Sequence, residues 1–90
     1  MFTALEQDFA SLRIRALALT VGGTFYHDED QYPTAMNQDQ SRAVCFHGKL
    51  GWIGWECGGP VHLLERSEIT QFLLNGLDKD KPRLALAYSN

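Results

Sequence analysis

The sequence predicts an α+β fold in which a small antiparallel sheet of about three to five strands carries two helices on one face. Helix-like periodicity appears near the start of the chain and again after residue 66, and a β-favouring centre rich in Val, Ile, Phe and Trp lies between them. The expected order is roughly helix, three or four strands, helix and strand, with the other face of the sheet open. The length of 90 residues suits one compact domain, residues 1–90.

The first expected helix begins after Thr3. Thr3 and Glu6 have the spacing of a capping box, in which a hydroxyl and a carboxylate satisfy the first free amides of a helix. Apolar residues then recur at spacings of four, three and four on one stripe, as in an amphipathic helix: Leu5, Phe9, Leu12 and Ala16. Gly22-Gly23 predicts the helix end. An end near Arg15 is the alternative, because residues 16–21 alternate nearly as a strand does.

A short strand over residues 24–26 is expected to run into a long acidic loop between Asp28 and Ser41. This loop exceeds most connections inside a compact domain, and it holds no lysine or arginine. Its acidic residues are Asp28, Glu29, Asp30 and Asp39. A calcium loop of the EF-hand type is not indicated, because Pro33 stands where such a loop needs glycine.

The firmest local prediction is a hairpin of two strands, Arg42–His47 and Trp52–Cys57, joined through Gly48–Gly51. Gly54, between two tryptophans, is expected to mark a bulge or a close approach of backbone or ring. A further short strand is expected over residues 61–64.

The second expected helix is capped by Ser67 and ends at Asn75-Gly76. Its buried face comprises Ile69, Phe72 and Leu73. After a solvated turn over residues 78–82, a half-buried closing strand is predicted from the alternation of Leu84, Leu86 and Tyr88.

Strand parity divides the hairpin between two faces. If Val44 and Phe46 face the core, Cys45 and His47 point outward, and we expect Ile53 and Trp55 to share the core side. The outward face of the hairpin would then gather the following side chains: Cys45, His47, Trp52 and Glu56. Cys57 would point inward.

Metal and nucleophile chemistry are weakly supported. The four zinc-type ligands are Cys45, His47, Cys57 and His62, but their spacing does not form the closely spaced pairs of structural zinc sites. A nucleophilic centre would use Cys45 or Ser41 with His47 as base and Glu56 as acid, yet no nucleophile-elbow or oxyanion pattern accompanies them. The glycines match neither a dinucleotide fingerprint nor a P-loop. We therefore expect no catalytic residues, no bound metal and no cofactor.

Composition narrows the class of partner. The net charge is −3 and the eight Lys and Arg residues are scattered, which disfavours direct nucleic-acid binding. Two cysteines without a secretion-type start favour free thiols and a cytoplasmic location. No run approaches the roughly 18 apolar residues that span a bilayer, so a membrane partner is not expected.

These observations favour a non-enzymatic protein-binding domain, an adaptor or an inhibitor. Its partner is expected to carry a basic surface, such as the nucleic-acid groove of a larger complex, because the chain offers an acidic loop. Small phage or mobile-element inhibitors of CRISPR complexes have this size, although no residue is specific for that role. The expected contact residues are Tyr26, Asp28, Glu29, Asp30, Tyr32, Asp39, His47, Trp52 and Glu56. The alternatives are a small metal- or ligand-binding domain that uses Cys45 and His47, and a nucleic-acid-binding module.

Overall fold

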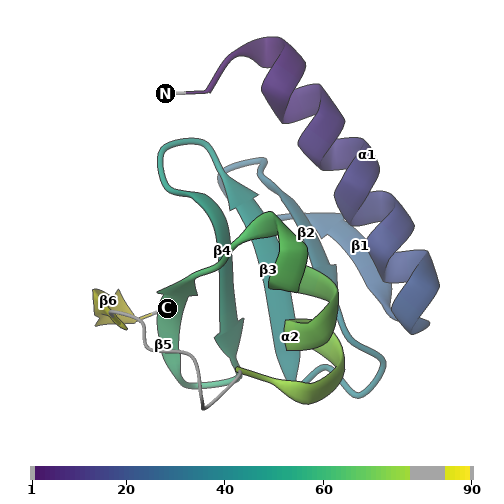
Figure 1. Ribbon diagram of the computed structural model, residues 1–90, viewed down its shortest axis with the longest axis vertical. Helices are drawn as coiled ribbons and strands as arrows, with labels where there is room; N and C mark the ends of the chain where they lie inside the picture. The colour runs from purple at the N-terminus through teal and green to yellow at the C-terminus, as the bar shows by residue number, and fades with distance from the viewer. Residues whose placement is uncertain (1, 78–84, 90) are drawn as a thin grey trace.

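The computed structural model describes residues 2–77 and the backbone of residues 85–89. Its elements in chain order are α1 (Ala4–Val21), β1 (Thr24–His27), β2 (Pro33–Met36), β3 (Arg42–His47), β4 (Gly51–Glu56), β5 (Pro60–Leu63), the 3-10 helix η1 (Arg66–Glu68), α2 (Ile69–Asn75) and β6 (Ala85–Ser89). The six strands form one antiparallel sheet in the order β1-β2-β3-β4-β5-β6, so each strand pairs with its neighbours in sequence (Figure 1). The predicted α+β class is confirmed.

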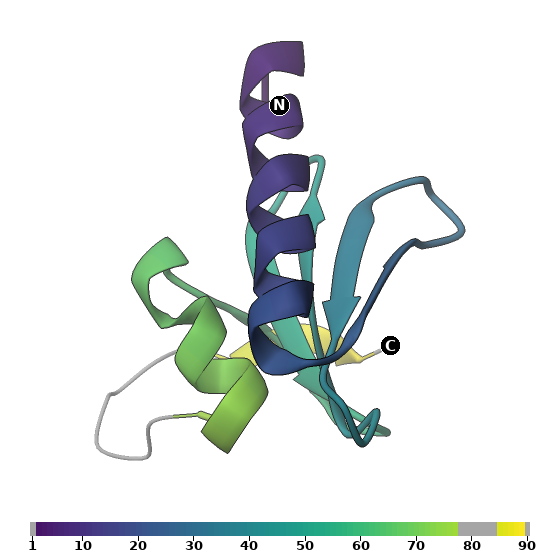
Figure 2. The ribbon, with the colours of Figure 1, turned by 90° about the vertical axis from the view of Figure 1, so that its right-hand side faces the viewer.

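Both helices lie on one face of the sheet, as predicted, and Figure 2 shows them side by side. They enclose the main core with the side chains that β2, β3 and the segment after β5 direct toward them. Its buried members are Ala10, Ile14, Leu17, Ala18, Ala35, Val44, Phe46, Leu64, Ile69, Phe72 and Leu73.

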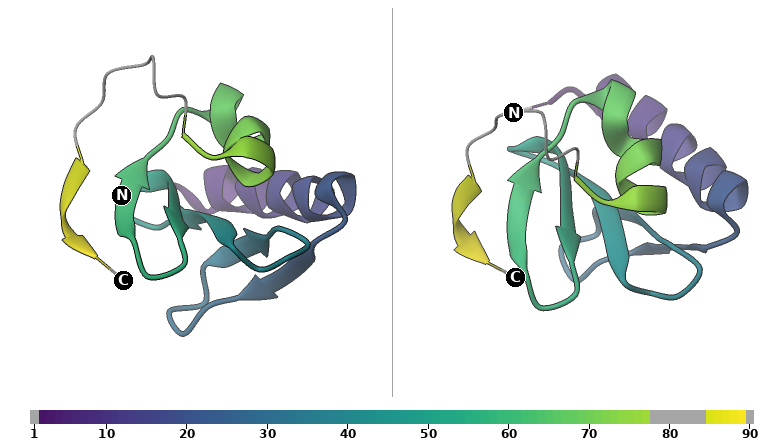
Figure 3. Two further views of the ribbon diagram at one scale, coloured as in Figure 1. Left: turned by 90° about the horizontal axis from the view of Figure 1, so that it is seen from below. Right: turned by 60° about the horizontal axis from the view of Figure 1, so that its bottom comes forward.

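The second face of the sheet is not open. The sheet curls from β1 round to β6 (Figure 3), and its inner side forms a smaller core of Cys45, Ile53 and Val61. Tyr32, Leu50 and Trp55 pack against that core. The expectation of an open face was wrong, because the twist that accumulates over successive strands folds this face onto itself.

Helix α1 begins and ends where the sequence indicates. The capping box of Thr3 and Glu6 is present, and Gly22 closes the helix in the left-handed conformation with φ of 69°. Its amide donates to the carbonyls of Ala18 and Leu19. The alternative end near Arg15 was therefore wrong.

The stripe of Leu5, Phe9, Leu12 and Ala16 is not the buried side of α1. All four side chains are exposed, and the side that packs on the sheet carries Ala10, Ile14, Leu17 and Ala18. The helix is apolar on both sides, and the buried side includes two alanines whose small side chains let the backbone approach the sheet. Periodicity alone could not choose between the two sides.

The region from Asp28 to Ser41 is not one long loop. Strand β2 lies within it and pairs with β1 and β3, which leaves two short turns. Asn37, 8% exposed, organises the second turn: its Oδ1 accepts hydrogen bonds from the amides of Ser41 and Arg42, and its Nδ2 donates to the carbonyl of Leu73 in α2. A buried asparagine thus ties the turn to the helix layer.

The β3–β4 hairpin is confirmed, and β5 lies within a residue of its expected position. Close approach at Gly54 is also confirmed, since a Cβ there would lie 2.8 Å from the ring of Phe72. Ser67 does not cap the second helix; it lies inside η1, where the amide of Glu65 donates to the carboxylate of Glu68 at 2.8 Å.

The buried face of α2 is Ile69, Phe72 and Leu73, as predicted. The expected turn over residues 78–82 and the position of Leu84 lie outside the described residues, as does the burial of Leu86 and Tyr88. The backbone of residues 85–89 forms the closing strand β6 beside β5. None of the helices in the described part of the chain has the length and apolarity that crossing a membrane requires.

Candidate functional site

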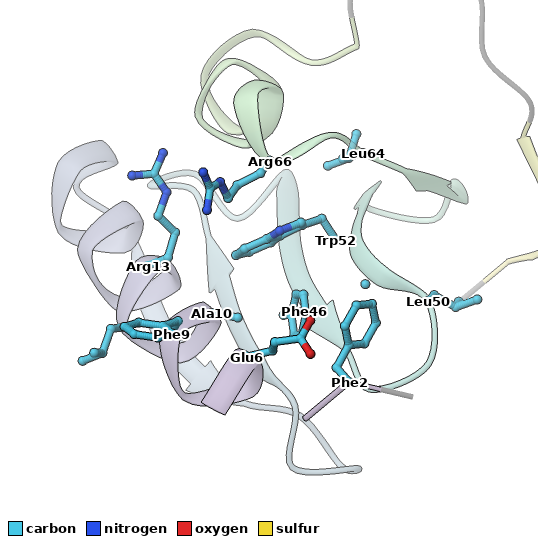
Figure 4. A pocket seen from close by; sticks show the side chains of 12 residues that line it. Phe2, Glu6, Phe9, Ala10, Arg13, Phe46, Leu50, Trp52, Leu64 and Arg66 are labelled. Atoms are coloured by element: carbon cyan, nitrogen blue, oxygen red, sulfur yellow. The ribbon is translucent and has the colours of Figure 1, made fainter. Parts of the chain in front are cut away.

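An apolar groove of about 830 Å³ runs between the first half of α1 and the β3–β4 hairpin. Figure 4 shows its side chains converging from α1, the hairpin and the segment after β5. It is lined by Phe2, Glu6, Phe9, Ala10, Leu12, Arg13, Phe46, Leu50, Gly51, Trp52, Leu64 and Arg66. A volume of this size lies in the usual range of binding sites, roughly 300–1,000 Å³.

The floor of the groove is aromatic. Phe46 and Trp52 are directly opposite each other in β3 and β4, and their rings meet edge to face at 5.0 Å between centroids. Phe2 covers the other side of Phe46 at 4.8 Å. It also lies against Gly51, where a Cβ would come within 3.2 Å of the Phe2 ring. The residue just before the helix thus builds one end of the floor.

The rim on the α1 side is apolar and solvent-exposed. Phe9 and Leu12 keep 63% and 64% of their surface exposed, whereas Ala10 between them is buried against the sheet layer. Exposed apolar groups that border a concave apolar surface are typical of binding sites. The apolar lining therefore continues out of the groove onto the helix.

Two cations lie at one end of the groove. Figure 4 places the guanidinium groups of Arg13 and Arg66 at the same end, away from Glu6 and Phe2. Within the described residues, neither arginine forms an ion pair. The carboxylate of Glu6 already accepts hydrogen bonds from the amide and hydroxyl of Thr3 at 3.2 and 3.0 Å. The groove thus combines an aromatic floor with two guanidinium groups that have no acidic partner among residues 2–77.

The predicted outward face of the hairpin is split between the two faces of the sheet. Val44 pairs with Gly54, and Phe46 with Trp52, so Trp52 and Glu56 lie on the helix side. Cys45 and His47 lie on the other side, together with Ile53 and Trp55. The register assumed for the hairpin was wrong by one residue, because β3 and β4 are joined by a three-residue loop, 48–50.

His47 holds that loop in place. Its Nδ1 accepts hydrogen bonds from the amides of Lys49 and Leu50 at 3.0 and 3.1 Å. The imidazole also packs on the ring of Tyr32 with 4.7 Å between centroids. The structure thus brings two of the predicted contact residues, His47 and Tyr32, next to each other. Their contacts are with each other and with the β3–β4 loop, so they stabilise the turns.

The acidic residues Asp28, Glu29 and Asp30 form the β1–β2 turn. The Asp28 carboxylate is used internally: its Oδ1 accepts from the amides of Asp30 and Tyr32 at 2.9 and 2.8 Å. Glu29 and Asp30 are exposed. Only these two carboxylates of the turn face solvent freely enough to meet a partner.

Two further groups lie next to Asp28. Cys45 is 1% exposed, and its Sγ lies 4.0 Å from Oδ2 of Asp28. Burial raises the pKa of the Cys45 thiol to about 12. Burial, together with the neighbouring Cys45 and Asp28, also raises the pKa of the Tyr26 phenol. The thiol is therefore protonated at neutral pH, and a thiol in that state is neither a good nucleophile nor a metal ligand.

The remaining predicted contact residues lie elsewhere. Asp39 is in the β2–β3 turn, where the Ser41 hydroxyl donates to its Oδ1 at 2.6 Å. The hydrogen bonds from the Ser41 hydroxyl and amide lower the pKa of the Asp39 carboxyl. Glu56 forms an ion pair with Arg42, with 3.4 Å between Oε2 and Nε.

The four zinc-type residues are not gathered. Cys57 is exposed at the opposite end of the hairpin from His47, and His62 lies on the helix side of the sheet, away from Cys45. Across the described residues, no three histidine, cysteine or acidic side chains come together as a metal site.

Of the predicted contact residues, only Trp52 lies in the groove. Sequence reasoning missed Phe2, Phe9, Arg13 and Arg66 as site residues. A signal was present, because α1 has apolar residues on two opposite sides and a single sheet covers only one of them.

No protein-family model, curated protein or solved structure matches this chain.

Proposed function

We propose that the chain is a non-enzymatic protein-binding domain, an adaptor or inhibitor, that holds an apolar segment of a partner protein in the groove between α1 and the β3–β4 hairpin. The observation that carries this proposal is the groove itself. It has an aromatic floor, an apolar rim more than half exposed at Phe9 and Leu12, and two arginines that form no ion pair with the described part of the chain.

The shape favours a protein segment over a small molecule. Small-molecule sites bury roughly 70–90% of their ligand, whereas one side of this groove is an exposed helix surface. An amphipathic helix or extended segment lays a row of apolar side chains on such a surface. Trp52 and Phe46 offer large, rigid contact areas, as anchor residues of interfaces do.

The charges specify one feature of the partner segment. Arg13 and Arg66 would be desolvated when the groove is filled, so a carboxylate on the segment would be needed to compensate them. Guanidinium groups bind carboxylates through paired hydrogen bonds, which adds geometric selectivity. The partner segment is therefore apolar with at least one acidic side chain near one end.

Binding without catalysis is supported by the lining. Among the described residues of the groove, the ionisable side chains are Glu6, Arg13 and Arg66, and Glu6 is engaged in the helix cap. The described lining residues include no serine, cysteine or histidine that could act as nucleophile or general base.

A second contact would use the acidic β1–β2 turn. Its exposed Glu29 and Asp30 would attract a basic patch on the same partner, as in the nucleic-acid groove of a larger complex.

Capture from a host extract with charge-reversed variants tests the groove. Arg66→Glu should reduce the amount of the main captured protein by about tenfold or more, a change that corresponds to ~1.4 kcal/mol. Lys49→Glu is the matched control, because it makes the same charge change at an exposed loop residue outside the groove lining. Equal capture by the two variants would contradict the proposal.

The double variant Glu29→Gln with Asp30→Asn tests the β1–β2 turn. It should associate with the partner more slowly, and its association rate should depend less on salt concentration.

A further inference from the structure

Helix α1 carries a second apolar side that no described part of the chain covers. It consists of five residues, here called the outer stripe: Leu5, Phe9, Leu12, Ala16 and Leu19. Its four large side chains are 63–80% exposed. Figure 2, which looks onto this helix from outside, shows no other ribbon in front of it.

The outer stripe faces directly away from the core. The opposite side of α1 buries Ala10, Ile14, Leu17 and Ala18 against the sheet. A helix that is apolar on both sides is normally covered on both sides, because each exposed leucine or phenylalanine forgoes the free energy of burial. The stripe is therefore a contact surface, and the remaining question is what covers it.

The spacing of the stripe points to another helix. Its residues are separated by four, three, four and three positions, which is the heptad pattern of two helices that pack along a common seam. The helix of 18 residues is about 27 Å long, so the seam extends over most of its length. Because the sheet already holds α1 in its helical form, pairing would not have to supply the cost of forming the helix.

The charges that flank the stripe favour a second copy of α1 as the occupant. Acidic Glu6 and Asp8 flank its first half, and basic Arg13 and Arg15 flank its second half. Glu6 and Arg13 lie seven positions apart on one flank, and Asp8 and Arg15 lie seven apart on the other. In an antiparallel pair of identical helices, each acidic residue meets a basic residue on its own flank.

We propose that two copies of this chain form a symmetric dimer through antiparallel packing of their α1 helices along the outer stripe. Leu5 of one copy packs beside Ala16 and Leu19 of the other, and Phe9 packs against Leu12. Glu6 faces Arg13 of the second copy, and Asp8 faces Arg15, whose guanidinium lies over the Phe25 ring of its own chain at 4.5 Å. The two-fold axis repeats every contact, and the opposed helix dipoles also favour this direction.

The dimer and the groove share two side chains, because Phe9 and Leu12 belong both to the outer stripe and to the groove rim. The aromatic floor of Phe46 and Trp52 and the side chain of Arg66 line the groove but are not part of the outer stripe. The dimer does not rest on the proposed function, since Leu5, Ala16 and Leu19 do not line the groove.

Sedimentation of the full chain over a range of protein concentrations tests the dimer. The wild type should shift from a 10.1 kDa monomer to a dimer as concentration rises. Leu5→Gln with Leu19→Gln should raise the dissociation constant at least tenfold, with circular dichroism unchanged because both side chains are exposed. Leu74→Gln is the matched control, because Leu74 is an exposed leucine on α2, and it should dimerise like the wild type. A wild type that stays monomeric at high concentration, or a stripe variant that dimerises unchanged, would overturn the proposal.

Disulfide trapping tests the direction of the helices. In a Cys57→Ser background, Leu5→Cys and Ala16→Cys variants are oxidised separately and as a mixture; Cys45 is buried and does not compete. Antiparallel packing predicts covalent dimers chiefly in the mixture, where position 5 meets position 16. Covalent dimers of Leu5→Cys alone, with none specific to the mixture, would show parallel packing and refute the proposed arrangement.

Discussion

Gly54 is the position at which one added methyl group should disturb the core most clearly. It lies in the middle of β4, under α2. In Gly54→Ala the new Cβ would lie 2.6 Å from Cδ1 of Leu64, and 2.8 and 3.0 Å from two ring atoms of Phe72. Real Cβ atoms essentially never approach other atoms so closely, so the neighbours must move. Phe72 is 1% exposed and packed on all sides, so it has no space to move into.

The expected cost of Gly54→Ala is that of overpacking a close-packed core, about 1–3 kcal/mol. In a domain of this size, that loss lowers the melting temperature by roughly 5–20 °C. Urea denaturation of the wild type and the variant, followed by circular dichroism, gives the free energy of unfolding directly. A variant within about 0.5 kcal/mol of the wild type would refute the packing described for Gly54.

A double-mutant cycle identifies the neighbour responsible. Leu64→Ala removes the closest atom, so Gly54→Ala should cost about 1 kcal/mol less in that background than in the wild type. Gly58→Ala serves as the control: its Cβ would meet nothing within 4 Å, and its cost comes from a φ of +78°. The free-energy costs of Gly58→Ala and Leu64→Ala should therefore add. Additivity between Gly54→Ala and Leu64→Ala would show that the strain lies elsewhere.

Three further predictions concern separate parts of the chain. Alkylation under native conditions should label Cys57 rapidly and Cys45 only after unfolding, because the buried thiol is both inaccessible and protonated; rapid labelling of both would contradict its burial. Thr3→Ala removes the cap of α1 and should reduce the free energy of unfolding by about 1 kcal/mol, measured by urea denaturation, whereas Thr3→Ser should keep most of it. The lowered pKa of Asp39 means that its carboxylate stabilises the fold above the ordinary pKa of 3.8 and loses this contribution as the pH falls below it. In Asp39→Asn, the free energy of unfolding should therefore fall less steeply as the pH is lowered. If an NMR titration of the wild type gave a midpoint at or above 3.8 for the Asp39 carboxyl, the hydrogen bonds from Ser41 would be excluded.

Local signals in the sequence predicted most of the fold. The Thr3 capping box and Gly22 fixed both ends of α1, because they act through hydrogen bonds and backbone geometry that depend only on neighbouring residues. The glycines between β3 and β4 predicted the hairpin for the same reason. Strand β2 was not predicted, because its four residues Pro33–Met36 show no alternation of apolar and polar side chains. The strand pairs with β1 and β3 on its two sides.

The candidate site was predicted poorly because it depends on choices made by tertiary packing. The assignment of Trp52 to one face of the sheet depended on the length of the β3–β4 loop. A change of one residue in that length moves every side chain of the strand to the opposite face. The two apolar sides of α1 were equally suited to packing, and the sheet selected the side with the small residues Ala10 and Ala18. Arg66 lines the groove because it is the first residue of η1, the 3-10 helix before α2. The sequence contains no local pattern that predicts a 3-10 helix at this point.

The sequential order of the strands also bears on how the chain folds. Since every strand pairs with its neighbour in sequence, the strand pairs from β1 to β5 close short loops, whereas β5 and β6 are joined through the longer segment that contains η1 and α2. Such a low contact order favours fast folding for a sheet protein. We expect the β3–β4 hairpin to form early and the outer strands to add to it in turn. Mutations at Val44 or Ile53 should then slow folding, whereas mutations at Phe25 in β1 should mainly speed unfolding. The opposite distribution in stopped-flow kinetics would indicate that the sheet assembles from its edge.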